Sequence, residues 1–101
     1  MIGEYTRYRI PEDRQEAFVK AYEKAAAYLK SSAHCLAYEL THCEEEKDRY
    51  ILRIEWKSTE EHLQGFRKEA GFKDFFQLVQ PYISNIEEMQ HYGITQVASR
   101  A

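Results

Sequence analysis

Hydrophobic and polar residues alternate at the start of the chain and then change period. From Glu4 to Ile10 they alternate among strand-forming residue types, which predicts a strand that ends before Pro11. After Pro11 the apolar residues recur at helical spacing, which predicts a helix of about 20 residues closed by Ser31 and Ser32. The recurring residues are Phe18, Tyr22, Ala25, Ala26 and Leu29.

Two further alternating runs follow this helix. Cys35 to Cys43 and Tyr50 to Trp56 each have the two-residue period of a strand, and the acidic segment 44–49 between them reads as a turn. Two such runs joined by a short polar turn predict an antiparallel hairpin. The residues predicted to share one face are Leu36, Tyr38, Leu40 and His42 in the first strand and Tyr50, Leu52, Ile54 and Trp56 in the second.

The third part of the chain predicts a second, interrupted helix and a last strand. Ser58 and Glu61 have the spacing of a capping box, with Ser58 as the N-cap. Gly71 is expected to break or bend this helix, and helical spacing resumes after it up to Pro81. The residues at that spacing are Phe72, Phe75, Phe76 and Val79. Segment 85–92 then alternates again and predicts the last strand.

The predicted order of elements is β-α-β-β-α-β, which is typical of a split β-α-β domain. Its class is α+β, with a four-stranded antiparallel sheet and two helices packed on one face. We expect one domain over residues 1–93, followed by a C-terminal tail over 94–101.

The other face of this sheet needs cover as well. The residues predicted to lie on it are Cys35, Ala37 and Thr41 on one strand and Ile51, Arg53 and Glu55 on the next. Such small and mixed side chains suit contact between two sheets better than open water. We therefore expect a homodimer formed through this sheet face.

Composition excludes several classes of function. The chain has 101 residues, of which 31% are charged with both signs interspersed, and a net charge of −3. Without a block of basic residues, nucleic acid is not an expected partner. No apolar stretch approaches the ~20 residues of a membrane span and no signal-peptide pattern follows Met1, so we expect no membrane partner and a cytoplasmic protein. Cys35 and Cys43 lie about 26 Å apart along one predicted strand, too far to form a disulfide.

Few side chains in the sequence have the spacing of a catalytic or metal-binding motif. The four histidines, His34, His42, His62 and His91, stand singly, and only His42 with Glu44 makes a weak two-ligand pair. Phosphate-binding glycine loops and the motifs of nucleophilic catalysis are absent from the sequence. We therefore predict no metal site.

A histidine at the edge of an aromatic cleft remains as the candidate. His62 and Phe66 lie one helical turn apart, and Trp56 ends the strand that leads into their helix. If the bend at Gly71 folds the chain back over the sheet, three more aromatic residues would line the same space: Phe75, Phe76 and Tyr82. His62 is then either a general base at an apolar pocket or a half-exposed histidine on an amphipathic helix. The sequence alone does not set the direction of its pKa shift.

The segment "ILRIEWKSTEEHLQGFRKEAGFKDFF", continued by "LVQPYISNIEEMQHY", resembles the antibiotic biosynthesis monooxygenase (ABM) family of the dimeric α+β barrel superfamily. The resemblance includes a strand ending in an aromatic residue, a helix opened by Ser58, a bend before Phe72 and a final strand that closes with residues 89–92. It implies a ferredoxin-like dimer with a cavity between sheet and helices in each subunit.

The resemblance also implies a chemistry. Name-giving members of the family oxidise a polyphenolic or anthrone-like substrate with O₂ and use neither metal nor flavin. Here His62 would be the base, Trp56 and Phe66 would sandwich the substrate, and Tyr8 or Tyr82 could hold a phenolic oxygen. The expected protein is an oxidoreductase of the monooxygenase type that needs no cofactor and acts on a small aromatic or quinol-like compound.

This chain departs from the family pattern at one telling position. Many members carry His or Trp six residues before the phenylalanine that follows the bend, and that position is Phe66 here. This departure favours the alternative that the chain is a non-catalytic dimeric module that binds a small molecule or assists another protein. Haem degradation ranks third: the first strand lacks the Asn used by that branch, and Phe66 and Phe76 replace its Trp and His.

Overall fold

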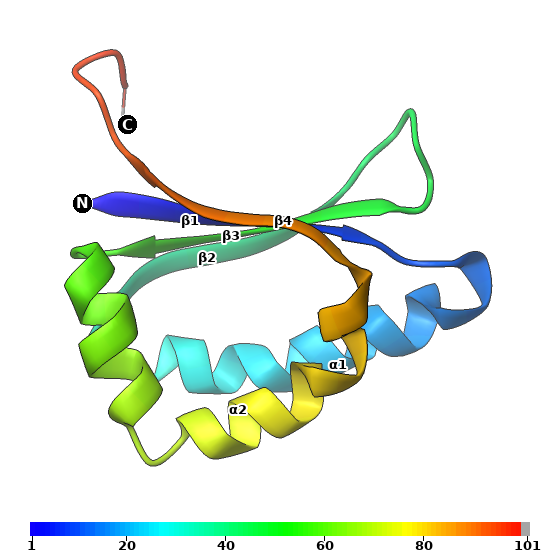
Figure 1. The fold of residues 1–101 in the computed structure, drawn as a ribbon, viewed down its shortest axis with the longest axis horizontal. Coiled ribbons are helices and arrows are strands. Elements are labelled where there is room, and N and C mark those ends of the chain that lie inside the picture. Colours follow the sequence, from blue (N-terminus) through cyan, green and yellow to red (C-terminus); the bar gives the residue numbers. More distant parts are fainter. Residues whose placement is uncertain (100–101) are drawn as a thin grey trace.

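The computed structural model describes residues 1–99 and confirms the predicted order of elements (Figure 1). The elements are β1 (Ile2–Arg9), α1 (Glu12–Lys30), β2 (Cys35–His42), β3 (Arg49–Trp56), a π-helix (Glu61–Gly65), a 3₁₀ turn (Phe66–Lys68), α2 (Phe72–Val79), a 3₁₀ helix (Gln80–Asn85) and β4 (Ile86–Gly93). Residues 94–99 form neither helix nor strand. None of the helices within 1–99 has the length and apolar character needed to cross a membrane.

The four strands form one antiparallel sheet in the order β2-β3-β1-β4. In Figure 1 both α1 and α2 lie on the same side of this sheet, and no helix covers the other side. The fold is therefore the expected α+β, ferredoxin-like arrangement. The strands β1 and β3 are central, so residues on their helix-facing side are covered on all flanks.

The core forms where α1 packs against the sheet. The residues of α1 that are buried recur at helical spacing: Phe18, Tyr22, Ala25 and Leu29. Phe18 is fully buried and lies within 4.8–5.3 Å, centroid to centroid, of Tyr8, Tyr22, Tyr50 and Tyr82. Edge-to-face aromatic pairs of this kind contribute roughly 0.5–1.5 kcal/mol each beyond their burial. The four predicted inward residues of β3 are all buried, as the alternation required.

One part of the predicted hairpin is wrong. Cys35 pairs with Trp56 and Ala37 pairs with Glu55, so the register shifts at Leu36. This bulge turns Cys35 toward the helices, where it packs against the core, while Leu36 is 46% exposed. Strict alternation predicts each of these two residues on the face opposite to the one observed. The difference arises because a one-residue bulge reverses the face of every side chain on one side of it. Both cysteines are free thiols.

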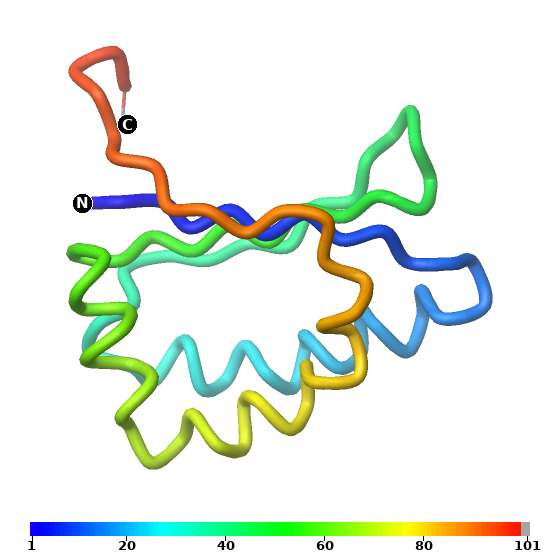
Figure 2. The backbone as a smooth tube through the Cα atoms, viewed as in Figure 1, coloured from blue at the N-terminus to red at the C-terminus, as the bar shows by residue number. Residues whose placement is uncertain are grey.

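The second helical region departs from a regular helix directly after its cap. The predicted cap is present, since the Glu61 amide donates to Ser58 Oγ at 3.0 Å. The chain then forms the π-helix and a 3₁₀ turn, breaks at 69–71 and turns sharply into α2 (Figure 2). A β-carbon on Gly65 would lie 2.7 Å from the ring of His34, so this close packing requires glycine. The break at Gly71 was predicted; the π-helical winding was not.

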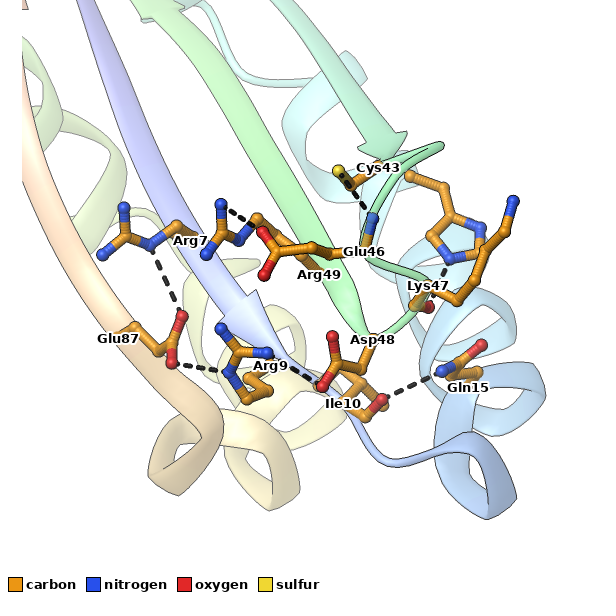
Figure 3. Close-up of polar contacts among 11 residues, drawn as sticks. Arg7, Arg9, Ile10, Gln15, Cys43, Glu46, Lys47, Asp48, Arg49 and Glu87 are labelled. Atoms are coloured by element: carbon orange, nitrogen blue, oxygen red, sulfur yellow. Dashed lines mark hydrogen bonds and ion pairs between the residues drawn. The ribbon is translucent and has the colours of Figure 1, made fainter.

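The uncovered face of the sheet carries a charged network at one end (Figure 3). Arg9 bonds Asp48 at 2.9 Å and Glu87 at 2.8 Å, and Arg7 lies 3.5 Å from Glu87. These pairs join β1 to β4 and to the β2–β3 turn. The side chains of these ion pairs are half-exposed, and each exposed ion pair of this kind contributes little to the stability of the fold.

Candidate functional site

A cavity of about 380 Å³ lies between the sheet and the helices. The strands contribute Glu4, Thr6, Tyr8, Leu52, Ile54, Trp56, Ile86 and Met89, and the helical segments contribute Tyr22, His62, Phe66, Arg67, Phe72, Phe75, Phe76, Val79 and Ile83. Most of these side chains are apolar or aromatic. A space of this size and lining suits a small, flat, largely apolar molecule.

The cavity reaches the surface between α2 and β4. Three of its apolar lining residues, Phe76, Ile83 and Met89, are 38–42% exposed, whereas the residues on β1 and β3 are buried. These three side chains therefore form an apolar rim around a closed interior. An apolar compound would pass this rim without leaving an unpaired polar group behind.

His62 lies on the wall of this cavity and is only 4% exposed. The π-helix that begins at Glu61 widens the turn and aims the imidazole at the sheet rather than at solvent. Its ring stacks on Trp56 with centroids 4.6 Å apart and planes 10° apart. The interpretation of His62 as a half-exposed surface residue is therefore wrong. Local π-helical turns are frequent at functional sites.

Two polar partners hold the edges of the His62 ring. Its Nδ1 lies 2.8 Å from Nε2 of His91 on β4, and its Nε2 lies 3.5 Å from Oε1 of Glu4 on β1. Trp56 donates from Nε1 to the same Glu4 oxygen at 2.9 Å. Three strands and the π-helix thus bring four polar or aromatic side chains into one cluster, in which only His91 is partly exposed.

Burial is the largest cause of the pKa shifts of His62 and Glu4. It lowers the pKa of His62 to about 4, with smaller effects in the same direction from Arg67 and His91, so the imidazole is neutral at neutral pH. Burial also raises the pKa of Glu4, against the opposing effects of the Trp56 hydrogen bond and the Arg67 charge. The carboxylate of Glu61, the residue before His62, lies 2.8 Å from His34 Nδ1 and belongs to a separate contact.

A pair of phenols forms another part of the cavity wall. The hydroxyl groups of Tyr8 and Tyr22 form a short hydrogen bond, and both rings line the cavity. Burial raises the pKa of Tyr8 to about 12 and that of Tyr22 still further, so both remain protonated at neutral pH. One hydroxyl of the pair donates to the other, which leaves the second proton available to a ligand oxygen.

The structure brings most of the predicted binding residues together. Tyr8, Phe66, Phe75 and Phe76 all line the cavity, as does Trp56. The predicted sandwich is wrong, because the rings of Trp56 and Phe66 lie 5.2 Å apart in direct contact and leave no room for a third ring.

Tyr82 does not line the cavity. It is buried, but it packs on Phe18 with ring centroids 5.1 Å apart, and the guanidinium of Arg14 lies over its ring. The prediction that Tyr82 walls the same space as Phe75 is therefore wrong. The 3₁₀ helix after α2 directs it toward α1 instead.

Sequence reasoning missed four residues of the site: Glu4, Tyr22, Arg67 and His91. Glu4 gave a signal, since it shares an alternating strand face with Thr6 and Tyr8 that the fold buries. His91 gave none, because its proximity to His62 depends on the pairing of β1 with β4.

Glu4, His62 and His91 form a group that could share a metal ion. Glu4, His62 and His91 each offer a ligand atom, and these atoms lie within 4.8 Å of one another. Along the sequence the histidines stand singly, but the fold brings two of them together beside a carboxylate.

Comparisons with known proteins agree with this architecture. A Bordetella bronchiseptica protein that carries the ABM name matches the structure with a TM-score of 0.76 and 22% identity over 93% of this chain and 96% of that one. Rv0793 of Mycobacterium tuberculosis matches with a TM-score of 0.76 and 13% identity, covering 97% of this chain and 98% of that one. At these identities the likeness establishes the fold.

The fold is a ferredoxin-like α+β domain with an aromatic-lined cavity between its sheet and its helices. The family model for antibiotic biosynthesis monooxygenase matches residues 1–78, and the chain belongs to that family. Among curated proteins, the uncharacterized protein YczJ of Bacillus subtilis (strain 168) is 25% identical over 92 residues, covering 91% of this chain and 97% of that protein.

Proposed function

We propose that this protein is a monooxygenase that oxidises a small aromatic, polyphenolic or quinol-like compound with O₂ and without a cofactor. The observation that carries the proposal is the position of His62: a buried imidazole on the wall of a 380 Å³ aromatic cavity, held by His91 and Glu4. Family membership supports the reaction class. The flat apolar lining supports an aromatic substrate.

The proposed reaction begins with proton transfer from the substrate to His62. A neutral imidazole accepts the proton, and the electron-rich anion then passes electrons to O₂. For an anthrone, the ring CH₂ becomes a carbonyl, one oxygen atom enters the product, and the other leaves as water with the two hydrogens. The protein supplies the base, the orientation and a site from which water is excluded.

His91 is the proposed second member of the proton path. Its Nε2 lies 2.8 Å from Nδ1 of His62, and unlike His62 it is partly exposed. When one nitrogen of His62 accepts a proton, the other ring nitrogen can release its own proton to His91. His91 can then pass this proton to water. The base would thereby return to its neutral form for the next turnover.

Tyr8 and Tyr22 are the proposed contacts for a substrate oxygen. Their hydroxyl pair lies in a lining that is otherwise mostly apolar, so a phenolic or carbonyl oxygen placed there gains a hydrogen bond that water would otherwise supply. This contact would orient the ring with its acidic position toward His62.

Oxygen uptake by metal-stripped protein tests this function. The panel consists of anthrones and hydroquinones, and the variants are His62→Ala and, as a matched control outside the cavity, His42→Ala. The expected result is uptake above the uncatalysed rate that falls at least tenfold in His62→Ala, a loss of about 1.4 kcal/mol of transition-state stabilisation. Binding without uptake across the panel would instead favour a non-catalytic binding module.

We also propose that two copies associate through the uncovered sheet face. That face carries Tyr5, Ile51 and Tyr92 beside Arg53, and Glu55 is only 5% exposed there although no helix covers it. Tyr5 and Tyr92 pack edge to face with centroids 5.3 Å apart, so this face presents a pair of exposed aromatic rings. Aromatic residues are typical of protein interfaces.

A further inference from the structure

We propose that Glu4, His62 and His91 form a binding site for a divalent first-row transition-metal ion on the wall of the cavity. This inference does not rest on the proposed function. It rests on two imidazoles and one carboxylate that three separate elements bring together, with ligand atoms within 4.8 Å of one another.

The donor set fits such an ion. Two histidine nitrogens and one carboxylate oxygen on one side of a metal, with the other positions open, are the ligands of many Fe(II) sites and also suit Co(II) and Zn(II). Magnesium and calcium prefer all-oxygen ligands and are not expected here. The class of ligand is therefore a transition metal rather than an alkaline-earth ion.

The observed distances require one of the three ligands to move. Ligands about 2.1 Å from a metal lie roughly 3.0–3.4 Å from one another in octahedral or tetrahedral geometry. Glu4 Oε1 and His62 Nε2 are 3.5 Å apart, close to this range. His91 Nε2 instead lies 2.8 Å from Nδ1, the other nitrogen of the His62 ring, so His91 has to leave that contact to reach the same ion. The widest separation in the cluster, 4.8 Å, exceeds this range, so one side chain has to turn inward. His91 is the one free to do so, because it lies partly exposed on the edge strand β4.

Neighbouring groups hold the first ligands in place. Trp56 donates to Glu4 Oε1 at 2.9 Å and stacks on His62 with planes 10° apart, so one indole orients two of the three ligands. Partners of this kind typically change metal affinity by 10–100-fold when they are removed.

The net charge of the site influences which further ligand would complete the coordination of the ion. Among the residues that line the cavity, Arg67 carries the only permanent positive charge, and it opposes the charge of the ion. The Glu4 carboxylate offsets one of these charges. The excess positive charge favours an anionic further ligand, such as a phenolate oxygen, in the open positions that face the cavity.

Metal binding and proton acceptance would compete at His62. An ion takes the nitrogen lone pair that a base needs, so a bound Zn(II) would block the proposed proton transfer. The two proposals are thereby separable: metal binding is measured without substrate or O₂, and oxygen uptake is measured on metal-stripped protein.

The experiment is a titration of the metal-free, full-length chain with Co(II), followed by visible absorption, and with Zn(II), followed by calorimetry. The variants are Glu4→Gln, His62→Gln and His91→Gln, with His42→Gln as the matched control because His42 lies on β2 outside the cavity. Far-ultraviolet circular dichroism and thermal unfolding check that each variant is folded.

We expect one Co(II) per chain, with d–d absorption bands of a site containing nitrogen and oxygen ligands. The affinity should fall tenfold or more in each of the three variants and stay unchanged in His42→Gln. Absence of binding to the wild-type chain would overturn the proposal. So would binding that survives any one of the three substitutions, since the site then lies elsewhere or lacks that ligand.

Discussion

The imidazole of His62 lies flat on the indole of Trp56, with centroids 4.6 Å and planes 10° apart. This contact gives Trp56 a different role from the one its sequence position suggested. One face of the indole is taken by His62 and its N–H is taken by Glu4, so Trp56 positions the polar cluster instead of stacking on a substrate. The histidine thereby keeps one orientation in which only the edge of its ring is available for chemistry.

Trp56 should report ligand binding directly, because it is the only tryptophan of the chain and lines the cavity. Titration with an anthrone is expected to change its fluorescence. The variant Val79→Phe puts a larger side chain into the cavity wall and should weaken this binding tenfold or more. Val97→Phe, the same change at a position that is 92% exposed, is the control and should bind like wild type. Equal binding by both variants would place the ligand outside the cavity.

The hydroxyl pair of Tyr8 and Tyr22 should show strong coupling in a double-mutant cycle. Either single change to Phe leaves a buried hydroxyl without its partner, at a cost of about 1–3 kcal/mol in the free energy of unfolding. The double variant removes both groups and should lose less than the sum of the two single losses. Urea unfolding of the four proteins measures this. Additive losses would mean that the two hydroxyls do not depend on each other.

Acid should weaken the network around Arg9. Its hydrogen bonds lower the pKa of Asp48 and of Glu87 from ordinary values of 3.8 and 4.5. A carboxyl with a lowered folded-state pKa contributes stability above its unfolded pKa and loses it as the pH falls through the folded value. Stability should therefore decline below about pH 4.5. Arg9→Met should flatten this decline in chemical unfolding measured from pH 7 to pH 3, and an unchanged slope would contradict the assignment.

The uncovered sheet face offers a test of self-association. Ile51→Glu places a charge in the middle of that face, on the central strand β3. If two copies meet there, light scattering coupled to size exclusion should show a dimer for the wild-type chain and a monomer for this variant. Ala27→Glu adds the same charge on the exposed side of α1 and should remain a dimer. A wild-type chain that is monomeric would contradict the proposed dimer.

Residues that follow a local period were predicted well. The alternation of β3 and the helical spacing of α1 placed the core, and the break near Gly71 predicted that Phe75 and Phe76 line the same cavity as Trp56. The local period gave wrong predictions where the backbone departs from a regular strand or α-helix. The bulge at Leu36 and the π-helix at Glu61 each add a residue to a turn or strand, and the sequence carries no marked signal for either.

Residues that meet through non-local strand pairing could not be predicted in the same way. His91 reaches His62 only because β4 pairs with β1, and Glu4 reaches both only because β1 lies at the centre of the sheet. Sequence reasoning named His62 from its local setting and missed both partners. The polar half of the site is thus a product of topology, whereas the aromatic half follows from local patterns.

Anaerobic spectroscopy of a bound anthrone tests the central claim most directly. Without O₂ the proposed reaction stops after proton transfer to His62, and the anthrone anion absorbs at longer wavelength than the neutral compound. We predict that the metal-stripped wild-type chain forms this anion at neutral pH. His62→Ala should still bind the anthrone, as judged from Trp56 fluorescence, but should leave it neutral. An anion that forms equally in both proteins would show that His62 is not the base.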